Sequence, residues 1–172
     1  MKKNNFTFKG LCCPVCLKHT LEVLELPYYI PNFGNSLIFL LKCNSCNYKN
    51  TDVLSLENKG PFKETITINK AEDMNIRIIK GSTAKVIIPE IIEIESSSLS
   101  EGYVSNIEGL LRRVIKAIEF ARDSSSKQNS KSIAERHIKK LKDVIDGRDS
   151  IKIIIDDPAG NSKILGPNEK LV

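Results

Sequence analysis

Two pairs of cysteines with the same internal spacing constrain this chain more than any other feature. Cys13 and Cys16 form one pair, Cys43 and Cys46 form the other, and 26 residues separate them. Each pair can hold a metal ion from one tight turn, and two pairs supply the four sulfurs of a closed tetrahedral site. The spacing therefore predicts a zinc ribbon in which these four cysteines bind one structural Zn²⁺.

Two disulfides, or a thioredoxin-like redox motif, would also place cysteines in pairs. No secretory segment opens the sequence, so we expect a cytoplasmic protein, in which disulfides are uncommon. A redox motif needs only one pair beside a βαβ pattern, which the sequence does not show. The fifth cysteine, Cys12, lies one residue too far from Cys16 for a knuckle, and we interpret it as a buried or idle thiol.

The residue after each cysteine pair is expected to adopt the left-handed backbone conformation that such turns require. Asn47 follows Cys46 and tolerates this conformation, whereas Leu17, at the equivalent place after Cys16, fits it less well. The sequence thus predicts local strain at Leu17.

With 172 residues, the chain can form one compact domain beside a small metal-stapled module. Its apolar fraction of 41% and charged fraction of 27% are those of a globular protein. No apolar run approaches the length of a membrane span, and we expect no membrane partner. The net charge of +5 is mildly basic, and 20 of the 26 basic residues are lysine.

We predict a zinc-ribbon finger over residues 1–58 and a β domain over residues 59–172. In the finger, strands are expected at Leu21–Leu26 and Ser36–Lys42, joined by a loop over 27–35 in which two prolines and Gly34-Asn35 break regular structure. In the second part, period-two patterns and turn signals predict short strands. These are Thr65–Ile68, Asn75–Lys80, Ala84–Ile88, Ile91–Glu95 and Ile151–Ile155.

A helical hairpin over about 105–146 interrupts these strands. Each helix is expected to follow a capping box, the first at Ser105–Glu108 and the second at Ser132–Glu135. The first apolar stripe runs from Ile107 to Ala121, and Gly147 is placed to end the second helix. The polar stretch 123–132 is expected to be a loop.

The sequence is poor in catalytic groups, and we expect no enzymatic activity. Its two histidines, His19 and His137, have no obvious nucleophile partner, and no phosphate-binding or nucleophile-elbow motif occurs. A small-molecule or enzyme role in the β domain ranks last. Asp156 and Asp157 could bind a cation, but neighbouring side chains on an extended chain point in opposite directions, and a tight turn explains them better.

Nucleic-acid binding is an alternative, because zinc ribbons often contact DNA or RNA. Residues 1–60 carry seven lysines, four acidic residues and no arginine. Their positive electrostatic field is therefore weak, and they lack arginine, the side chain that donates two hydrogen bonds at once to a phosphate or a base. Arg112, Arg113 and Arg122 add a modest basic stripe on the first helix. A nucleic-acid or ribosome-associated zinc ribbon therefore stays as the second interpretation.

Several segments together resemble the ZPR family of zinc-finger proteins. The matching segments occur in the family's order and span residues 13 to 162. They are Cys13-Pro-Val-Cys16, Ile30-Pro31-x-Phe33, Cys43-x-x-Cys46-x-Tyr48-Lys49-Asn50, Ile88-Pro89-Glu90-Ile91, Asn106-Ile107-Glu108-Gly109-Leu110-Leu111 and Asp156-Asp157-Pro158-Ala159-Gly160-Asn161-Ser162. Eukaryotic members carry two finger-plus-β units in tandem, so this chain resembles the single-unit archaeal form. It departs from the pattern at Gly34-Asn35, where relatives often place a charged pair, and at Asn47, which replaces a glycine.

The resemblance implies a mainly β protein with a four-cysteine finger, like that of translation initiation factor two beta, and a double-stranded β-helix domain carrying the helical hairpin. It implies no catalysis. Eukaryotic relatives bind the GTPase translation elongation factor one alpha and assist its folding, so an elongation-factor-type GTPase is the expected partner. For contact with that partner we predict Tyr28, Tyr29 and Phe33 in the finger loop, since aromatic side chains often anchor interfaces. We also predict the loop of Asp156, Asp157 and Asn161, because a rigid loop loses little entropy on docking.

Overall fold

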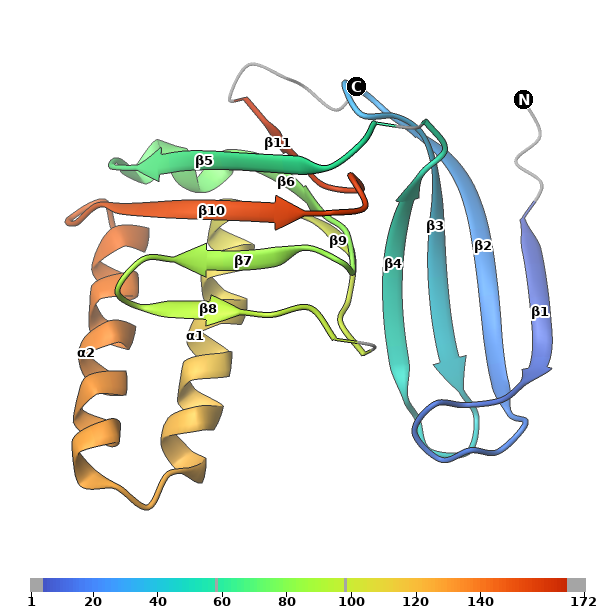
Figure 1. Ribbon diagram of the computed structural model, residues 1–172, viewed down its shortest axis with the longest axis horizontal. Helices are drawn as coiled ribbons and strands as arrows, with labels where there is room; N and C mark the ends of the chain where they lie inside the picture. Colours follow the sequence, from blue (N-terminus) through green and yellow to red (C-terminus); the bar gives the residue numbers. More distant parts are fainter. Residues whose placement is uncertain (1–4, 58, 98, 167–172) are drawn as a thin grey trace.

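The computed structural model describes residues 5–57, 59–97 and 99–166. Figure 1 shows two parts side by side: a four-stranded ribbon on the right, and a β domain with two helices on the left. The predicted boundary between residues 58 and 59 falls in the connection between the ribbon's last strand and the first strand of the β domain. Residue 58 itself lies outside the described residues.

The ribbon is one antiparallel sheet in the order β1-β2-β3-β4. Its strands are β1 (Phe6–Leu11), β2 (Leu21–Ile30), β3 (Gly34–Cys43) and β4 (Lys49–Ser55). The fourth strand lies against the β domain, and the first forms the outer edge (Figure 1).

The loop predicted over 27–35 is largely strand, and that prediction is wrong. β2 and β3 stay paired up to Ile30 opposite Gly34, so the chain reverses over residues 31–33. Pro27 is accommodated opposite Leu37 because β1 pairs with β2 only as far as Glu25. Beyond Glu25, β2 pairs only with β3 in the described chain, so this part of β2 is a sheet edge. A proline at an edge need not remove a hydrogen bond between strands, because its nitrogen can face outward.

The β domain contains two antiparallel sheets. One has the order β5-β10-β7-β8 and the other β11-β6-β9. The strands are β5 (Phe62–Ile68), β6 (Arg77–Lys80), β7 (Lys85–Ile88), β8 (Ile92–Ile94), β9 (Tyr103–Asn106), β10 (Ile151–Asp157) and β11 (Lys163–Leu165). A short 3₁₀ helix, η1 (Ala71–Asn75), precedes β6, where the sequence predicted strand from Asn75 onward.

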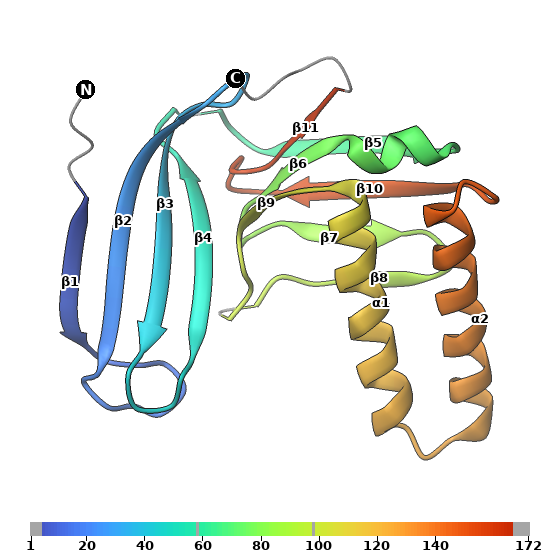
Figure 2. The same cartoon turned by 180° about the vertical axis from the view of Figure 1, so that it is seen from behind.

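Helices α1 (Ile107–Ser124) and α2 (Gln128–Ile145) cover one face of the β5-β10-β7-β8 sheet (Figure 2). The stripe of α1 from Ile107 to Ile118 is buried, as are Ile138, Leu141 and Val144 of α2. They join the inward side chains of both sheets in one aliphatic core. Ala121, the last predicted member of the stripe, is exposed instead.

The ends of the helices differ from the predicted capping boxes. Asn106, not Ser105, caps α1, and its side-chain oxygen accepts a hydrogen bond from the N–H of Gly109 at 2.9 Å. α2 begins at Gln128, so most of the predicted loop is helical and only residues 125–127 connect the helices. A polar helix end that projects into solvent carries no apolar periodicity to reveal it. Gly147 does end α2 as predicted, with φ of 72°.

The described helices include none that is both long and apolar enough to cross a membrane.

Candidate metal centre and partner surface

The four paired cysteines meet at one end of the ribbon. Cys13 and Cys16 lie in the turn between β1 and β2, and Cys43 and Cys46 lie at the turn between β3 and β4. Their four sulfurs all lie within 4.8 Å of one another. The Sγ atoms of Cys13 and Cys46 are 3.7 Å apart, as are those of Cys16 and Cys43.

These distances fit a tetrahedral metal site. With Zn–S bonds of about 2.3 Å, four sulfurs around one zinc ion lie about 3.8 Å from each other. The observed 3.7 Å separations match that edge, and they far exceed the bond of about 2.05 Å that a disulfide needs. All five cysteines of the chain are free. Four thiolate ligands leave no coordination position for water, so a zinc ion here would be structural.

The two turns that hold the cysteines are matched in their backbone geometry. The N–H of Cys13 donates to the carbonyl of Lys18 at 2.9 Å, and that of Cys43 donates to Tyr48 at 2.8 Å, five residues on in both cases. Leu17 has φ of 60° and Asn47 has φ of 58°. The predicted left-handed positions are therefore confirmed, including the unfavourable one at Leu17.

Polar groups from the turns support the sulfur of Cys43. The Thr20 hydroxyl lies 3.2 Å from it, and the N–H of Ser45 donates to it at 3.4 Å. The Thr20 hydroxyl is the main reason that the pKa of the Cys43 thiol is lowered to about 6. Thr20 could not be identified from the sequence, because a single hydroxyl has no diagnostic spacing.

Cys12 and the two histidines stay apart from the metal centre. Cys12 is exposed, not buried, and its thiol lies 3.6 Å from the carbonyl of Leu17. His19 Nδ1 is 3.3 Å from the carbonyl of Gly10, and His137 is half-buried on α2.

The three aromatic residues predicted to contact a partner lie at the other end of the ribbon, and they divide into two groups. Tyr28 and Tyr29 are exposed, 45% and 63% respectively. Phe33 is only 1% exposed and packs with Ile79 and Leu165 of the β domain. This burial removes Phe33 from the predicted partner surface, because it belongs to the core that joins the two parts.

The predicted contact loop after β10 is mainly structural. The Asp157 carboxylate is fully buried and accepts hydrogen bonds from Thr83 Oγ1 at 2.5 Å and Ser162 Oγ at 2.6 Å. Asn161 accepts from the backbone N–H of Ser55 at 2.9 Å and so ties the ribbon to the β domain. Asp156 and Asn161 are half-buried, and Asp156 pairs with Lys63 at 2.6 Å. Asp157 is therefore corrected from a partner contact to a buried structural residue.

Polar contacts along β4 form the rest of the junction, and sequence reasoning missed them. Both carboxylate oxygens of Asp52 accept from Ser82, one from its N–H at 3.1 Å and one from its hydroxyl at 2.6 Å. The backbone N–H of Gly102 donates to the carbonyl of Thr51 at 2.8 Å, and the Thr51 hydroxyl donates back to Gly102 at 2.7 Å. A Cβ atom at Gly102 would lie 2.1 Å from Asp52, so this close approach needs glycine.

A buried cation lies beside this junction. Lys80 is 6% exposed, and its amine donates to the carbonyls of Gly81 and Glu101 at 3.1 and 3.2 Å. Burial lowers the pKa of the Lys80 amine, and the negative charges of Asp157 and Asp52 partly offset that effect.

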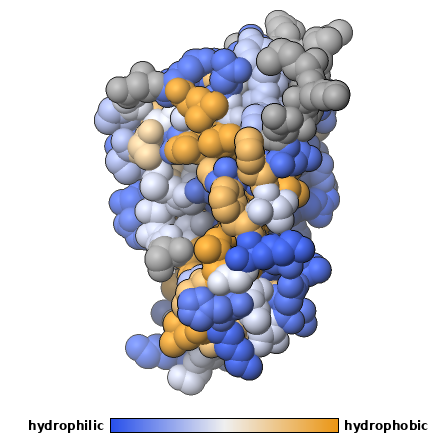
Figure 3. Space-filling view, turned by 90° about the vertical axis from the view of Figure 1, so that its right-hand side faces the viewer, coloured by the Kyte–Doolittle hydropathy of each residue, from blue (hydrophilic) through white to orange (hydrophobic). Residues whose placement is uncertain are grey.

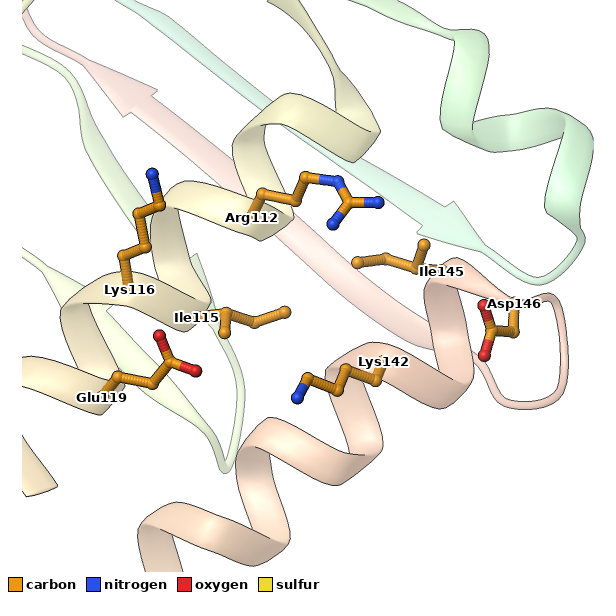
Figure 4. Close-up of a pocket in the computed structure, with 7 residues that line it drawn as sticks. All are labelled: Arg112, Ile115, Lys116, Glu119, Lys142, Ile145 and Asp146. Atoms are coloured by element: carbon orange, nitrogen blue, oxygen red, sulfur yellow. The ribbon is translucent and has the colours of Figure 1, made fainter.

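Two hollows in the described surface show no catalytic arrangement among the residues that line them. A groove of about 410 Å³ between α1 and α2 has Ile115 and Ile145 beside five charged side chains (Figure 4). A second, of about 690 Å³, lies between the ribbon and the β domain. The ribbon lines it with apolar side chains together with Asn50 and Asp52, and the β domain lines it mainly with serines. The lining residues of both grooves include no histidine or cysteine.

The comparisons with known proteins agree with this architecture. The family model of the ZPR1 jelly-roll domain matches residues 72–171. The chain belongs to the ZPR1 family. It is 37% identical to a ZPR1-like protein of Methanocaldococcus jannaschii over 162 residues, which cover 91% of this chain and 80% of the relative. It is 32% identical to a ZPR1-like protein of Pyrococcus horikoshii over 163 residues, covering 92% and 73%.

Relatives in the ZPR1 family also occur in eukaryotes. The zinc finger chaperone zpr1 of Schizosaccharomyces pombe is 30% identical over 158 residues, which cover 88% of this chain but 33% of that protein. With the sulfur geometry, this membership confirms one zinc ion held by Cys13, Cys16, Cys43 and Cys46. The predicted fold, a zinc ribbon followed by a jelly-roll (double-stranded β-helix) domain with a helical hairpin, is likewise confirmed.

Proposed function

We propose that this ZPR1 family member is a non-enzymatic zinc-binding protein that binds an elongation-factor-type GTPase in the cytoplasm and assists its folding. Membership of the family supports a protein partner, since the fission-yeast relative is named a chaperone. The elongation-factor GTPase comes from the resemblance given above. No step in this role needs a catalytic group.

The observation that carries the proposal is the apolar surface of the ribbon. Figure 3 views the molecule from the β1 side, and apolar side chains gather there along most of its length. The exposed apolar side chains of the ribbon lie on both faces of its sheet and in the first cysteine turn. They are Phe6, Phe8, Leu11, Val15, Leu17, Tyr29, Leu40 and Leu54. So many exposed apolar side chains on one small sheet are typical of a protein that binds another protein, because a monomer rarely exposes large apolar patches.

The test is a titration of the zinc-loaded protein with the elongation-factor GTPase of its own organism. The GTPase would be used nucleotide-free, with GDP and with GTP, at two salt concentrations. We expect binding that survives the higher salt, since apolar contact is little screened, and that differs between nucleotide states. Absence of binding in every state would refute this partner.

Exposed and buried aromatic residues of the ribbon tip provide a matched pair for that titration. Tyr29→Ala should weaken binding without changing zinc content or the melting temperature. Phe33→Ala should lower the melting temperature instead, because Phe33 is core. Equal loss of stability in both variants would show that Tyr29 is also structural.

One observation favours the alternative of a nucleic-acid or ribosome-associated protein. Residues 107–145, the helical hairpin, carry ten basic and five acidic residues, and this excess equals the net charge of the whole chain, +5. The rest of the chain is therefore neutral. RNA binding by the hairpin should weaken steeply as salt rises, in contrast to the salt-resistant binding expected for the GTPase.

A further inference from the structure

The two outer edges of the ribbon sheet differ in whether another part of the molecule covers them. At the β4 edge, Thr51 exchanges hydrogen bonds with Gly102, so the β domain covers part of that edge. At the β1 edge, β2 is the only strand that pairs with β1 in residues 5–57, 59–97 and 99–166. The outer backbone groups of residues 6–8 are therefore open to another strand, whereas the Gly10 carbonyl lies 3.3 Å from His19 Nδ1.

The side chains of β1 do little to protect this edge. All six residues of the strand are exposed, with Phe6 at 51% and Phe8 at 47%. Natural edges are usually blocked by charged residues, proline, bulges or short length. Here the only charged residue is Lys9, followed by Gly10 at the irregularity between Phe8 and Leu11. Residues 6–8 remain a regular, uncharged segment.

Apolar rows from the sheet lead up to both faces of this edge. On one face Phe8 lies beside Val23, which lies beside Leu41. On the other face the neighbour of Thr7 is Leu24, followed by Leu40, itself 39% exposed. A strand added outside β1 would therefore lie beside Phe6 and Phe8 on one face and beside Thr7 on the other, where Leu24 follows one strand further in.

We propose that the β1 edge binds an extended segment of a partner protein, which adds to the ribbon as a fifth strand. Main-chain hydrogen bonds to residues 6–8 supply the attachment, and alternating apolar side chains of the segment pack beside Phe6 and Phe8. This inference rests on the proposed function and gives its mode of contact. The folding factor pairs with a strand of its client protein before that strand pairs with its neighbour in the client's own sheet.

A second copy of this chain is a poorer occupant. Pairing β1 with β1 of another copy would bring together six residues on each side. A stable protein–protein interface uses about 20–30 residues a side. A partner that continues from the edge onto the apolar surface of the ribbon can reach that size, and a symmetric pair of short strands cannot.

The edge can be tested without the GTPase. The probe is a synthetic decapeptide of alternating valine and threonine with glutamate at both ends, titrated into the full zinc-loaded protein and followed by amide NMR. We expect shifts confined to β1 and its neighbours, and slower hydrogen exchange at the outward amides of β1. The same peptide N-methylated at each valine and threonine should not bind, because it lacks the donors.

Proline variants supply the matched control on the protein. Adjacent residues of a strand point their N–H groups to opposite sides, so of Thr7→Pro and Phe8→Pro one removes an outward donor and the other a bond to β2. The variant that keeps the melting temperature should bind the peptide about three- to tenfold more weakly, as expected for one lost hydrogen bond.

Three results would overturn the inference: shifts elsewhere on the molecule, equal binding of the N-methylated peptide, or β1 shifts that grow with protein concentration alone, which would identify a second copy.

The outcomes of the peptide and GTPase titrations separate the edge site from the proposed GTPase partner. Peptide binding without GTPase binding refutes the named partner and keeps the edge site. GTPase binding that leaves the β1 amides unprotected refutes the edge site and keeps the partner.

Discussion

The ribbon and the jelly-roll domain are stabilised in opposite ways. In the jelly-roll domain, one aliphatic cluster joins both sheets and both helices. Among residues 5–57 of the ribbon, buried apolar side chains gather at the two ends: Leu21 with Cys13 and Cys43 at the metal site, and Ile30 and Phe33 with Val53 against the β domain. The middle of its sheet is half-exposed on both faces. A sheet fastened at its ends can leave its faces open to a partner.

Removal of zinc should have the largest effect and should separate the two parts. Structural zinc in such sites typically contributes about 10–16 kcal/mol, more than the small ribbon core can replace. We expect a strong chelator to unfold the ribbon while the jelly-roll domain keeps its amide dispersion. Cys12→Ser, which leaves the ligands untouched, is the control and should retain zinc. Ribbon amides that stay dispersed without metal would contradict this view of the ribbon.

The next largest effect is expected where the two parts share a core. Phe33→Ala should lower the free energy of unfolding by about 3–5 kcal/mol, because it empties a fully packed position. Tyr29→Ala, four residues away and exposed, should change it by less than about 0.5 kcal/mol. Urea denaturation of both variants measures the difference. Similar midpoints would mean that the ribbon tip does not depend on the jelly-roll domain.

A smaller loss is expected at the buried carboxylate below the junction. Asp157→Asn keeps the shape but weakens the charged hydrogen bonds from Thr83 and Ser162, and should cost about 1.5–3 kcal/mol. Asp156→Asn removes a surface ion pair with Lys63 and should cost at most about 1 kcal/mol. Thermal unfolding of the pair gives the comparison, and a larger loss at Asp156 would reverse our assignment of the two carboxylates.

The smallest expected change in stability concerns the two matched zinc turns, and substitutions in the two turns should change stability in opposite directions. Leu17→Gly should stabilise the ribbon by about 1 kcal/mol, because it relieves a left-handed conformation at a side chain that packs on little. Asn47→Leu imposes the same strain on the other turn and should destabilise by a similar amount. Competition with a chelator would report both changes, and a Leu17→Gly variant that loses zinc more readily would contradict the strain.

Much of this structure could be predicted from sequence because its strongest signals are local. The Cys-x-x-Cys spacing identified the metal ligands, and helical periodicity located α1 and most of α2. The strands β1, β4, β9 and β11 were missed, although Phe6-Thr7-Phe8 does alternate. Such short segments become strands through their partners, so their own pattern is a weak guide.

The partner surface could be predicted only in part, since the burial of a loop residue depends on what folds against it. Tyr29 and Phe33 look alike in the sequence, yet Ile79 and Leu165, far along the chain, cover only Phe33. Asp156 and Asp157 are likewise neighbours with opposite surroundings. The alternation of side chains along a strand predicted that Asp156 and Asp157 point in opposite directions. It could not predict that Thr83 and Ser162 lie beside Asp157.

The ribbon is attached to the jelly-roll domain along β4, which is one edge strand of its sheet. β1 lies three strand spacings from that side, about 14 Å at 4.8 Å per strand. The tip of the ribbon is attached as well, because Ile30 and Phe33 pack with Ile79 and Leu165 of the β domain. The free edge at β1 thus lies on the side of the ribbon away from the jelly-roll domain (Figure 1), so an incoming segment could pair with it without meeting that domain.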